Sequence, residues 1–176
     1  MSNDNIETLK AAIRDVPDFP KKGILFKDIT TLIDKGGLFK SAIENFTEKY
    51  SNSGINKVVA VESRGFIFGA PVAYGIGSGF IPVRKKGKLP YKTISATYSL
   101  EYGTDTLEMH QDAIKPGDNV LIIDDLLATG GTMGAVIELV KKSGGKVAGI
   151  AFLIELSFLD GRSKLRDYDV FSLIKY

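Results

Sequence analysis

The sequence contains no cysteine among its 176 residues, so it forms no disulfide bond and carries no thiol chemistry. This absence fits the reducing interior of a cell. The opening residues MSNDNIETLK lack the apolar core of a signal peptide, and no stretch approaches the roughly 20 apolar residues of a membrane span. We therefore expect a cytoplasmic protein that does not associate with membranes.

A strong excess of charge of either sign is also missing. The formal net charge of +2 does not by itself indicate a nucleic-acid-binding protein. Basic patches do not recur along the chain and no helix-turn-helix pattern is present, so we expect no nucleic-acid partner. Histidine occurs once, as His110. It falls at the edge of a predicted helix over residues 107–114, where we expect a surface position without a catalytic role.

Apolar runs alternate with amphipathic segments along the chain. This order predicts an α/β fold with a central, mostly parallel sheet flanked by helices. The predicted strands cover residues 58–61, 80–83, 119–123 and 146–156. The predicted helices cover residues 6–14, 38–50 and 131–142, and a fourth follows the loop 62–65 and ends near Tyr74, while residues 18–34 form a connector. Because no linker or repeat interrupts this order, we expect one domain over residues 1–176.

The most informative segment is VLIIDDLLATGGT, residues 120–132. Its four apolar residues predict a buried parallel strand, which places Asp124 and Asp125 at the strand's carboxyl end, where open parallel sheets bind ligands. Two consecutive acids diverge on an extended backbone and can accept hydrogen bonds from adjacent hydroxyls, such as those of a ribose. The small residues that follow are Ala128, Thr129, Gly130, Gly131 and Thr132. At the start of the helix 131–142, their N–H groups form a nest for a phosphate.

The alternative for residues 120–132 is an acidic, glycine-rich surface turn. We disfavour it because two charged residues directly after four apolar ones are costly to place unless something binds them.

Two further loops follow predicted strands. Residues 62–65, ESRG, place Arg64 beside a helix start, and residues 84–88, RKKGK, hold four cations. Either loop alone is compatible with a solvated connection. For residues 84–88, a solvated loop is the simpler interpretation as long as the place of the loop after a strand is not considered. Together with residues 124–132, both lie at the carboxyl edge of one sheet. This shared edge favours a cationic pocket for a polyphosphate.

Residues 120–132 resemble the 5-phosphoribosyl-1-pyrophosphate (PRPP) motif of the type I phosphoribosyltransferases. Further segments are similar to the adenine phosphoribosyltransferases, and together they cover nearly the whole chain: DFPKKGILFKDIT, ESRGFIFGAPVA, RKKGKLP, ATYSLEYG, LLATGGTMGA and FLIEL. The resemblance implies the type I phosphoribosyltransferase fold with a small N-terminal hood over residues 1–34, a flexible lid loop and a homodimer. It also implies adenine and PRPP as substrates, with AMP and pyrophosphate as products of purine salvage.

The resemblance assigns roles residue by residue. Ribose and 5′-phosphate binding falls to Asp124, Asp125 and residues 128–132. Pyrophosphate binding falls to Glu62, Ser63, Arg64, Arg84 and Lys88, with a cis peptide bond between Glu62 and Ser63. The lid residues Glu101 and Tyr102 act in catalysis together with Arg64. Adenine binding falls to Leu25 C=O, Lys27 N–H and the ring of Phe26; relatives often carry arginine in place of Lys27, which a backbone contact tolerates. Mg²⁺ is held mainly by substrate and water, because no cluster of metal ligands is present in the sequence.

Other interpretations remain open at this point. From sequence alone, residues 96–103 are compatible with an edge hairpin, and residues 24–26 with simple core packing. The enzyme alternative is a 6-oxopurine or orotate transferase, against which residues 23–29 and the ATYSLEYG segment argue. The non-enzyme alternative is a PRPP-sensing regulator. Such regulators usually carry an added nucleic-acid-binding part, for which we expect no room in 176 residues.

Overall fold

The computed structural model describes residues 3–99 and 103–176, which divide into two compact units, Met1–Asn45 and Phe46–Tyr176. The first unit contains helix α1 (Asn3–Ala11), strands β1 (Arg14–Pro17) and β2 (Leu25–Asp28), helix α2 (Thr30–Ile33) and most of helix α3 (Gly36–Tyr50). Strands β1 and β2 pair in antiparallel fashion, with Val16 opposite Phe26. In the described part of the chain, no helix is both long and apolar enough to cross a bilayer.

The first unit differs in two places from the expectation. The predicted helix over residues 6–14 ends at Ala11, and Arg14 already belongs to β1. The predicted connector 18–34 contains β2 and α2. Asp28 fixes the end of β2, because its carboxylate accepts hydrogen bonds from Arg14 Nε at 3.1 Å and from the backbone N–H of Thr30 at 2.9 Å. The hydrogen bonds from Arg14, and then those from Thr30, lower the pKa of Asp28 to about 2.

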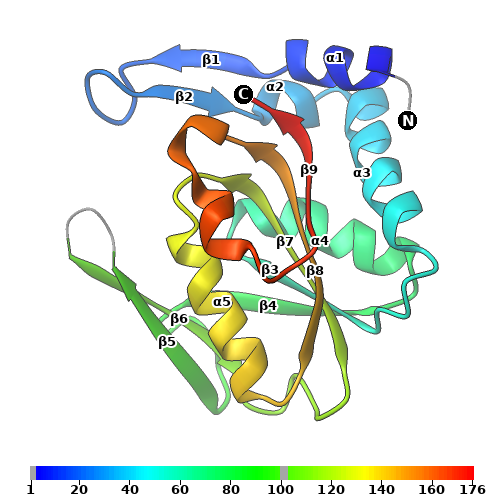
Figure 1. Cartoon of the computed structure of the whole chain (residues 1–176), viewed down its shortest axis with the longest axis vertical. Helices are drawn as coiled ribbons and strands as arrows, with labels where there is room; N and C mark the ends of the chain where they lie inside the picture. The colour runs from blue at the N-terminus through cyan, green and yellow to red at the C-terminus, as the bar shows by residue number, and fades with distance from the viewer. Residues whose placement is uncertain (1–2, 100–102) are drawn as a thin grey trace. The chain divides into compact units, whose positions relative to one another are not determined.

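The second unit is built on one sheet. Among the described residues its seven strands lie in the order β5-β6-β4-β3-β7-β8-β9 (Figure 1). The strands are β3 (Lys57–Val61), β4 (Gly79–Lys85), β5 (Thr93–Ser99), β6 (Thr104–His110), β7 (Asn119–Leu127), β8 (Lys146–Glu155) and β9 (Val170–Lys175). Neighbours from β4 to β9 are parallel, whereas β6 is antiparallel to both β4 and β5. The predicted central, mostly parallel sheet is confirmed.

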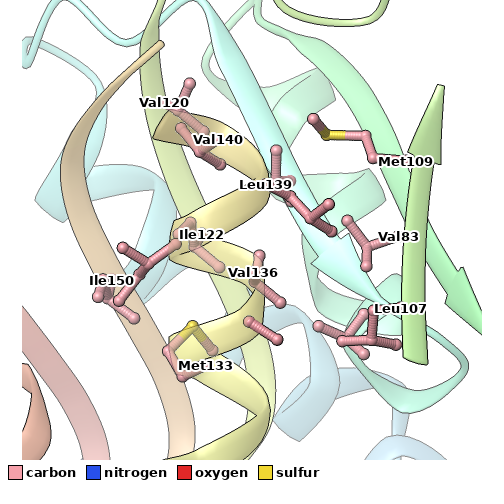
Figure 2. Packing of buried hydrophobic residues seen from close by; sticks show 14 of the residues in the cluster. Val83, Leu107, Met109, Val120, Ile122, Met133, Val136, Leu139, Val140 and Ile150 are labelled. Atoms are coloured by element: carbon pink, nitrogen blue, oxygen red, sulfur yellow. The ribbon is translucent and has the colours of Figure 1, made fainter. Parts of the chain in front are cut away.

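Helices cover both faces of this sheet. Helix α5 (Gly131–Lys142) lays the apolar side chains Met133, Val136 and Val140 onto one face, where they meet residues of β7, β8 and β6 (Figure 2). Helix α4 (Arg64–Gly75) packs on β3, β4 and β7, and an added Cβ at Gly69 would lie 2.6 Å from Ala60 Cβ of β3. Glycine at this position therefore lets α4 approach the sheet closely.

Three expectations for the second unit need correction. Residues 107–110 belong to β6, so the predicted helix over residues 107–114 is wrong. Strand β7 continues to Leu127, so Asp124 and Asp125 lie within the last residues of the strand and not after its end. Strand β9 and the short 3-10 helices η1 (Ser157–Leu159) and η2 (Gly161–Leu165) follow β8 and were not predicted. The helix predicted over residues 131–142 is confirmed at both ends.

Candidate active site

A pocket of about 420 Å³ opens at the carboxyl ends of β3 and β7, beside the starts of α4 and α5. It is lined by residues 61–64, residues 124–133, and the side chains of Lys85, Tyr98, Leu107 and Phe152. Two loops that the sequence places more than 50 residues apart thus meet at one site, as expected for neighbouring parallel strands. The pocket brings together Glu62, Ser63, Arg64, Asp124, Asp125 and residues 128–132.

The paired acids of β7 lie at the base of this pocket. Asp125 is buried, and its Oδ2 atom lies 2.8 Å from Arg64 Nε. Asp124 accepts a hydrogen bond from the backbone N–H of Asp125 at 2.9 Å. Burial, and then the charge of Asp125, raise the pKa of Asp124. Burial also raises the pKa of Asp125, although the Arg64 guanidinium opposes this shift. Both carboxyl groups are therefore poorly solvated hydrogen-bonding groups that a polar ligand would stabilise.

The start of α4 approaches the acids through a glycine. A Cβ added at Gly65 would lie 2.9 Å from Asp124 Oδ1 and 3.2 Å from the carbonyl oxygen of Ile123. A larger residue would push α4 away from β7, and with it Arg64. The glycine that ends the ESRG segment therefore keeps Arg64 within reach of Asp125.

The turn from β7 into α5 has the geometry of an anion site. Gly130 is the N-cap of α5 and adopts a left-handed conformation with φ of 76°, which glycine tolerates without strain. The first N–H groups of an α-helix have no acceptor within the helix, and the helix dipole adds positive potential there. Gly130 has no side chain to occupy those donors. We call residues 128–132 the phosphate turn.

Glu62 organises the basic residues that follow β4. Its buried carboxylate accepts hydrogen bonds from the backbone N–H of Lys85 at 2.6 Å and from Arg84 Nε at 3.1 Å, and it pairs with Lys88 Nζ at 3.1 Å. Burial raises the pKa of Glu62, but the hydrogen bonds from Lys85, Lys88 and Arg84 outweigh burial and lower it below the ordinary value. The Glu62–Ser63 peptide bond is cis, as the resemblance implied.

Arg84 and Lys88 are not among the residues that line the pocket, whereas Lys85, which lies between them, is. Lys85 Nζ lies 3.0 Å from Asp105 Oδ2, and the hydrogen bond that Lys85 donates to Asp105 raises the pKa of Lys85. Tyr98 is opposite Asp105 in the β5–β6 register and also lines the pocket. Sequence reasoning missed Lys85 and Tyr98, although both belong to segments that it singled out.

Residues 96–99 are part of β5, at the edge of the sheet, and Ser99 pairs with Thr104 of β6. The edge-hairpin interpretation is therefore confirmed for this part of the segment. Glu101 and Tyr102 lie outside the described residues.

His110 is the last residue of β6 and does not line the pocket. Its Nε2 atom is buried without a hydrogen-bond partner in the described structure, and its ring stands edge-on to the ring of Tyr91.

The adenine segment predicted from the sequence is β2 of the first unit. The rings of Phe26 and Phe19 meet edge to face with centroids 5.1 Å apart, and Leu25 is 48% exposed. Lys27 Nζ donates a hydrogen bond to Asp15 Oδ1 at 2.6 Å, and the Lys27 side chain is largely buried. The charged end of Lys27 is therefore occupied within its own unit, which suits a role of this residue through its backbone.

Comparison with known proteins shows to which family the chain belongs. Residues 30–175 match the family model described as the phosphoribosyl transferase domain. The chain is 58% identical over 164 residues to the adenine phosphoribosyltransferase of Desulfitobacterium hafniense, covering 93% of this chain and 95% of the relative. The relative from Kosmotoga olearia is also 58% identical, over 168 residues, covering 96% and 99% of the two chains.

Solved structures give the same result. The adenine phosphoribosyltransferase of Thermoanaerobacter pseudethanolicus superposes with a TM-score of 0.94 at 54% identity, covering 97% of this chain and 99% of that one. The Saccharomyces cerevisiae enzyme, solved with adenine and an imino-altritol bisphosphate, superposes with a TM-score of 0.92 at 42% identity, covering 98% and 100%. Both the sequence and the fold, over nearly their whole length, show that the chain belongs to the adenine phosphoribosyltransferase family.

Proposed function

We propose that this protein transfers the 5-phosphoribosyl group from PRPP to adenine and forms AMP and pyrophosphate. The observation that carries the proposal is a single pocket that is lined both by the acid pair of β7 and by the phosphate turn at the start of α5. A ribose 5-phosphate has two adjacent hydroxyls and a terminal phosphate, and this pocket offers acceptors for the former and N–H donors for the latter.

The donor binds in one orientation. Its 5′-phosphate occupies the phosphate turn, and its ribose hydroxyls donate to Asp124 and Asp125. The pyrophosphate group then reaches toward the loop after β3, where Ser63 and Arg64 line the pocket. Lys85 adds a third cationic or polar group from β4. Arg84 and Lys88, which Glu62 holds beside this loop, add positive potential to the same side.

The reaction requires alignment more than covalent help from the protein. Purine N9 attacks the anomeric carbon as the bond to pyrophosphate breaks, and positive charge develops on the sugar ring. The enzyme stabilises the leaving pyrophosphate with cations and excludes water, which would otherwise hydrolyse the donor. Glu101 exchanges a proton with the purine imidazole edge, and Tyr102 helps to close the lid over the reactants.

Adenine is selected by backbone polarity. Its 6-amino group donates to Leu25 C=O, its N1 accepts from Lys27 N–H, and Phe26 packs on the ring. Hypoxanthine and guanine present the reverse pair of groups, which would leave buried polar atoms unpaired and reduce use of these bases by roughly 10⁴-fold. Two related structures support a purine ligand in the family: the yeast enzyme was solved with adenine, and the Giardia lamblia enzyme with 9-deazaadenine.

The pocket residues fit a Mg²⁺ ion that arrives with the donor. In the part of the chain that the structure describes, no three acidic, histidine or cysteine side chains gather as a metal cage. Mg²⁺ commonly keeps water and substrate phosphates among its ligands, so the donor and water would hold the ion mainly, with Asp124 and Asp125 as carboxylates of the pocket lining near them. When bound, Mg²⁺ would neutralise charge on the leaving pyrophosphate.

Three further features remain predictions from the sequence. We propose that residues 1–176 work as one catalytic domain, with residues 1–34 as a hood, that two chains form a homodimer, and that the protein is cytoplasmic.

A coupled assay tests the proposed function. The purified protein is supplied with PRPP, Mg²⁺ and, in turn, adenine, hypoxanthine, guanine or orotate, and pyrophosphate release is followed. We expect release with adenine at a kcat/KM about 10⁴-fold above that of the 6-oxopurines. Equal use of hypoxanthine or guanine would refute the assignment of the base, and release with none of the four would refute the transfer reaction itself.

A further inference from the structure

The phosphate turn is backed by a second turn from a distant part of the chain. A Cβ added at Gly130 would lie 2.8 Å from the carbonyl oxygen of Gly161, at the start of η2. A Cβ added at Gly161 would overlap the carbonyl oxygen of Ala128 and lie 3.1 Å from the backbone nitrogen of Gly130. The two backbones are therefore in direct contact, with no room for a side chain between them. Figure 1 shows this orange segment between β8 and β9, near the start of α5.

Gly161 is required here for space and not for its backbone conformation. It is buried and does not adopt a positive φ, unlike Gly130. Alanine could therefore take the same backbone angles at Gly161 in a less crowded place. The replacement would act through its Cβ alone, which pushes on Ala128 and Gly130 of the phosphate turn.

The position of Gly161 is fixed by its neighbour Arg162. The Arg162 guanidinium donates from Nε and Nη2 to the two carboxylate oxygens of Glu155, at 3.0 and 2.6 Å. Its Nη1 atom donates to the carbonyl oxygen of Val170 at 2.9 Å, and Nη2 also reaches Ser172 Oγ at 3.2 Å. One side chain thus ties η2 to the end of β8 and to β9. Leu165, four residues beyond Gly161, is buried in the core beneath α5.

We infer that Gly161 and Arg162 are positioning residues for the 5′-phosphate of the donor: Gly161 supports the phosphate turn from behind, and Arg162 holds Gly161 in place. The inference rests on the proposed function, in which the phosphate turn binds that group. N–H donors act on a phosphate only within a narrow range of distance and angle. A shift of the turn by a fraction of an ångström therefore weakens donor binding, while the groups that act on the anomeric carbon stay in place.

Gly161→Ala tests the inference, with Gly134→Ala as the matched control. Gly134 lies one turn into α5, and a Cβ added there would meet nothing within 4 Å. Calorimetry with ribose 5-phosphate gives the affinity of the phosphate turn, and steady-state kinetics give KM for PRPP and for adenine. We expect Gly161→Ala to raise the dissociation constant for ribose 5-phosphate and KM for PRPP about 10- to 100-fold. KM for adenine and kcat at saturating PRPP should stay within about twofold, and Gly134→Ala should match the wild type.

Arg162→Lys provides a second test if Gly161→Ala does not fold. Lysine keeps a positive charge beside Glu155 but cannot make the paired contact with both carboxylate oxygens while also reaching Val170. We expect a severalfold rise in KM for PRPP with an unchanged KM for adenine. Melting temperature is measured alongside, because a residue that only stabilises the fold would lower it without changing the affinity of folded protein.

The outcomes separate this inference from the function on which it rests. If the wild type binds ribose 5-phosphate and the folded variants bind it equally well, the positioning role is refuted and the proposed function stands. The same holds if the variants lose thermal stability but keep wild-type affinity. If the wild type itself does not bind ribose 5-phosphate, the phosphate assignment fails and the positioning role fails with it.

Discussion

Glu62→Gln is the substitution whose consequences the structure defines most fully. The Glu62 side chain is only 7% exposed, and its carboxylate accepts hydrogen bonds from Arg84, from the backbone N–H of Lys85 and from Lys88. Glutamine keeps one oxygen for the Lys85 N–H but places an NH₂ donor where the other oxygen faced a cation. Hydrogen bonds to a charged group contribute about 1.5–3 kcal/mol each. The Arg84 and Lys88 side chains are 36% and 49% exposed, so solvent screens their contribution, and we expect a net loss of about 2 kcal/mol.

Thermal unfolding measures this loss. For a chain of this length, about 2 kcal/mol lowers Tm by roughly 4–8 °C. Glu138→Gln is the matched control: Glu138 pairs with Lys142 on the surface of α5, with both side chains about half exposed, so its removal should cost about 0.5 kcal/mol or less. If Glu62→Gln and Glu138→Gln lowered Tm by the same small amount, the organising role of Glu62 would be refuted.

The effect of Glu62→Gln should also depend on pH. The three donors hold the pKa of Glu62 below its ordinary value despite burial, which raises it. Glu62 therefore contributes stability above the ordinary carboxyl pKa, and that contribution is lost as the pH falls through the lowered value. The difference in Tm between the wild type and Glu62→Gln should thus shrink in acid. A difference that grows in acid would contradict the assignment.

Four other substitutions test the proposed site. Asp124→Asn and Asp125→Asn should lower kcat/KM for PRPP while leaving Tm largely intact, because both carboxyl groups are already poorly solvated; near-wild-type kcat/KM in both would remove the ribose assignment. Gly130→Val should abolish PRPP binding in calorimetry, since valine disfavours φ of 76° and its Cβ would meet Gly161; unchanged affinity would place the phosphate elsewhere. Glu101→Gln should lower kcat by about 10²- to 10⁴-fold with little change in PRPP affinity, and full activity across pH would leave the lid only the role of excluding water.

Local pattern predicted those elements whose signal lies within their own residues. Helix α5 was placed correctly over residues 131–142 because its apolar side chains recur at helical spacing, Gly130 precedes it and Lys142 ends it. The apolar residues of 107–114 also fit helical spacing, so the sequence predicts a helix where part of β6 lies. Its true state depends on pairing with β5 and β4, which periodicity does not report. The sequence predicts too long an N-terminal helix because Ile13 continues the helix's apolar face, although α1 ends at Ala11 and β1 begins at Arg14.

The site was predictable as far as its residues lie near the carboxyl ends of strands. Arg64, Asp125 and the phosphate turn meet because parallel neighbours bring their carboxyl ends together, and that rule needs no coordinates. The choice among the cations of residues 84–88 was not predictable in this way. Glu62 engages Arg84 and Lys88 while Lys85 lines the pocket, and this division depends on the local path of the backbone. The support from Gly161 comes from some 30 residues further along, in a segment without a recognisable motif.

A crystal structure of the protein with AMP tests the central claim most directly. We predict the 5′-phosphate of AMP on the N–H groups of residues 129–132, and the two ribose hydroxyls on Asp124 and Asp125. AMP bound outside the pocket between β3 and β7, or bound in it with the phosphate directed away from the start of α5, would contradict the account.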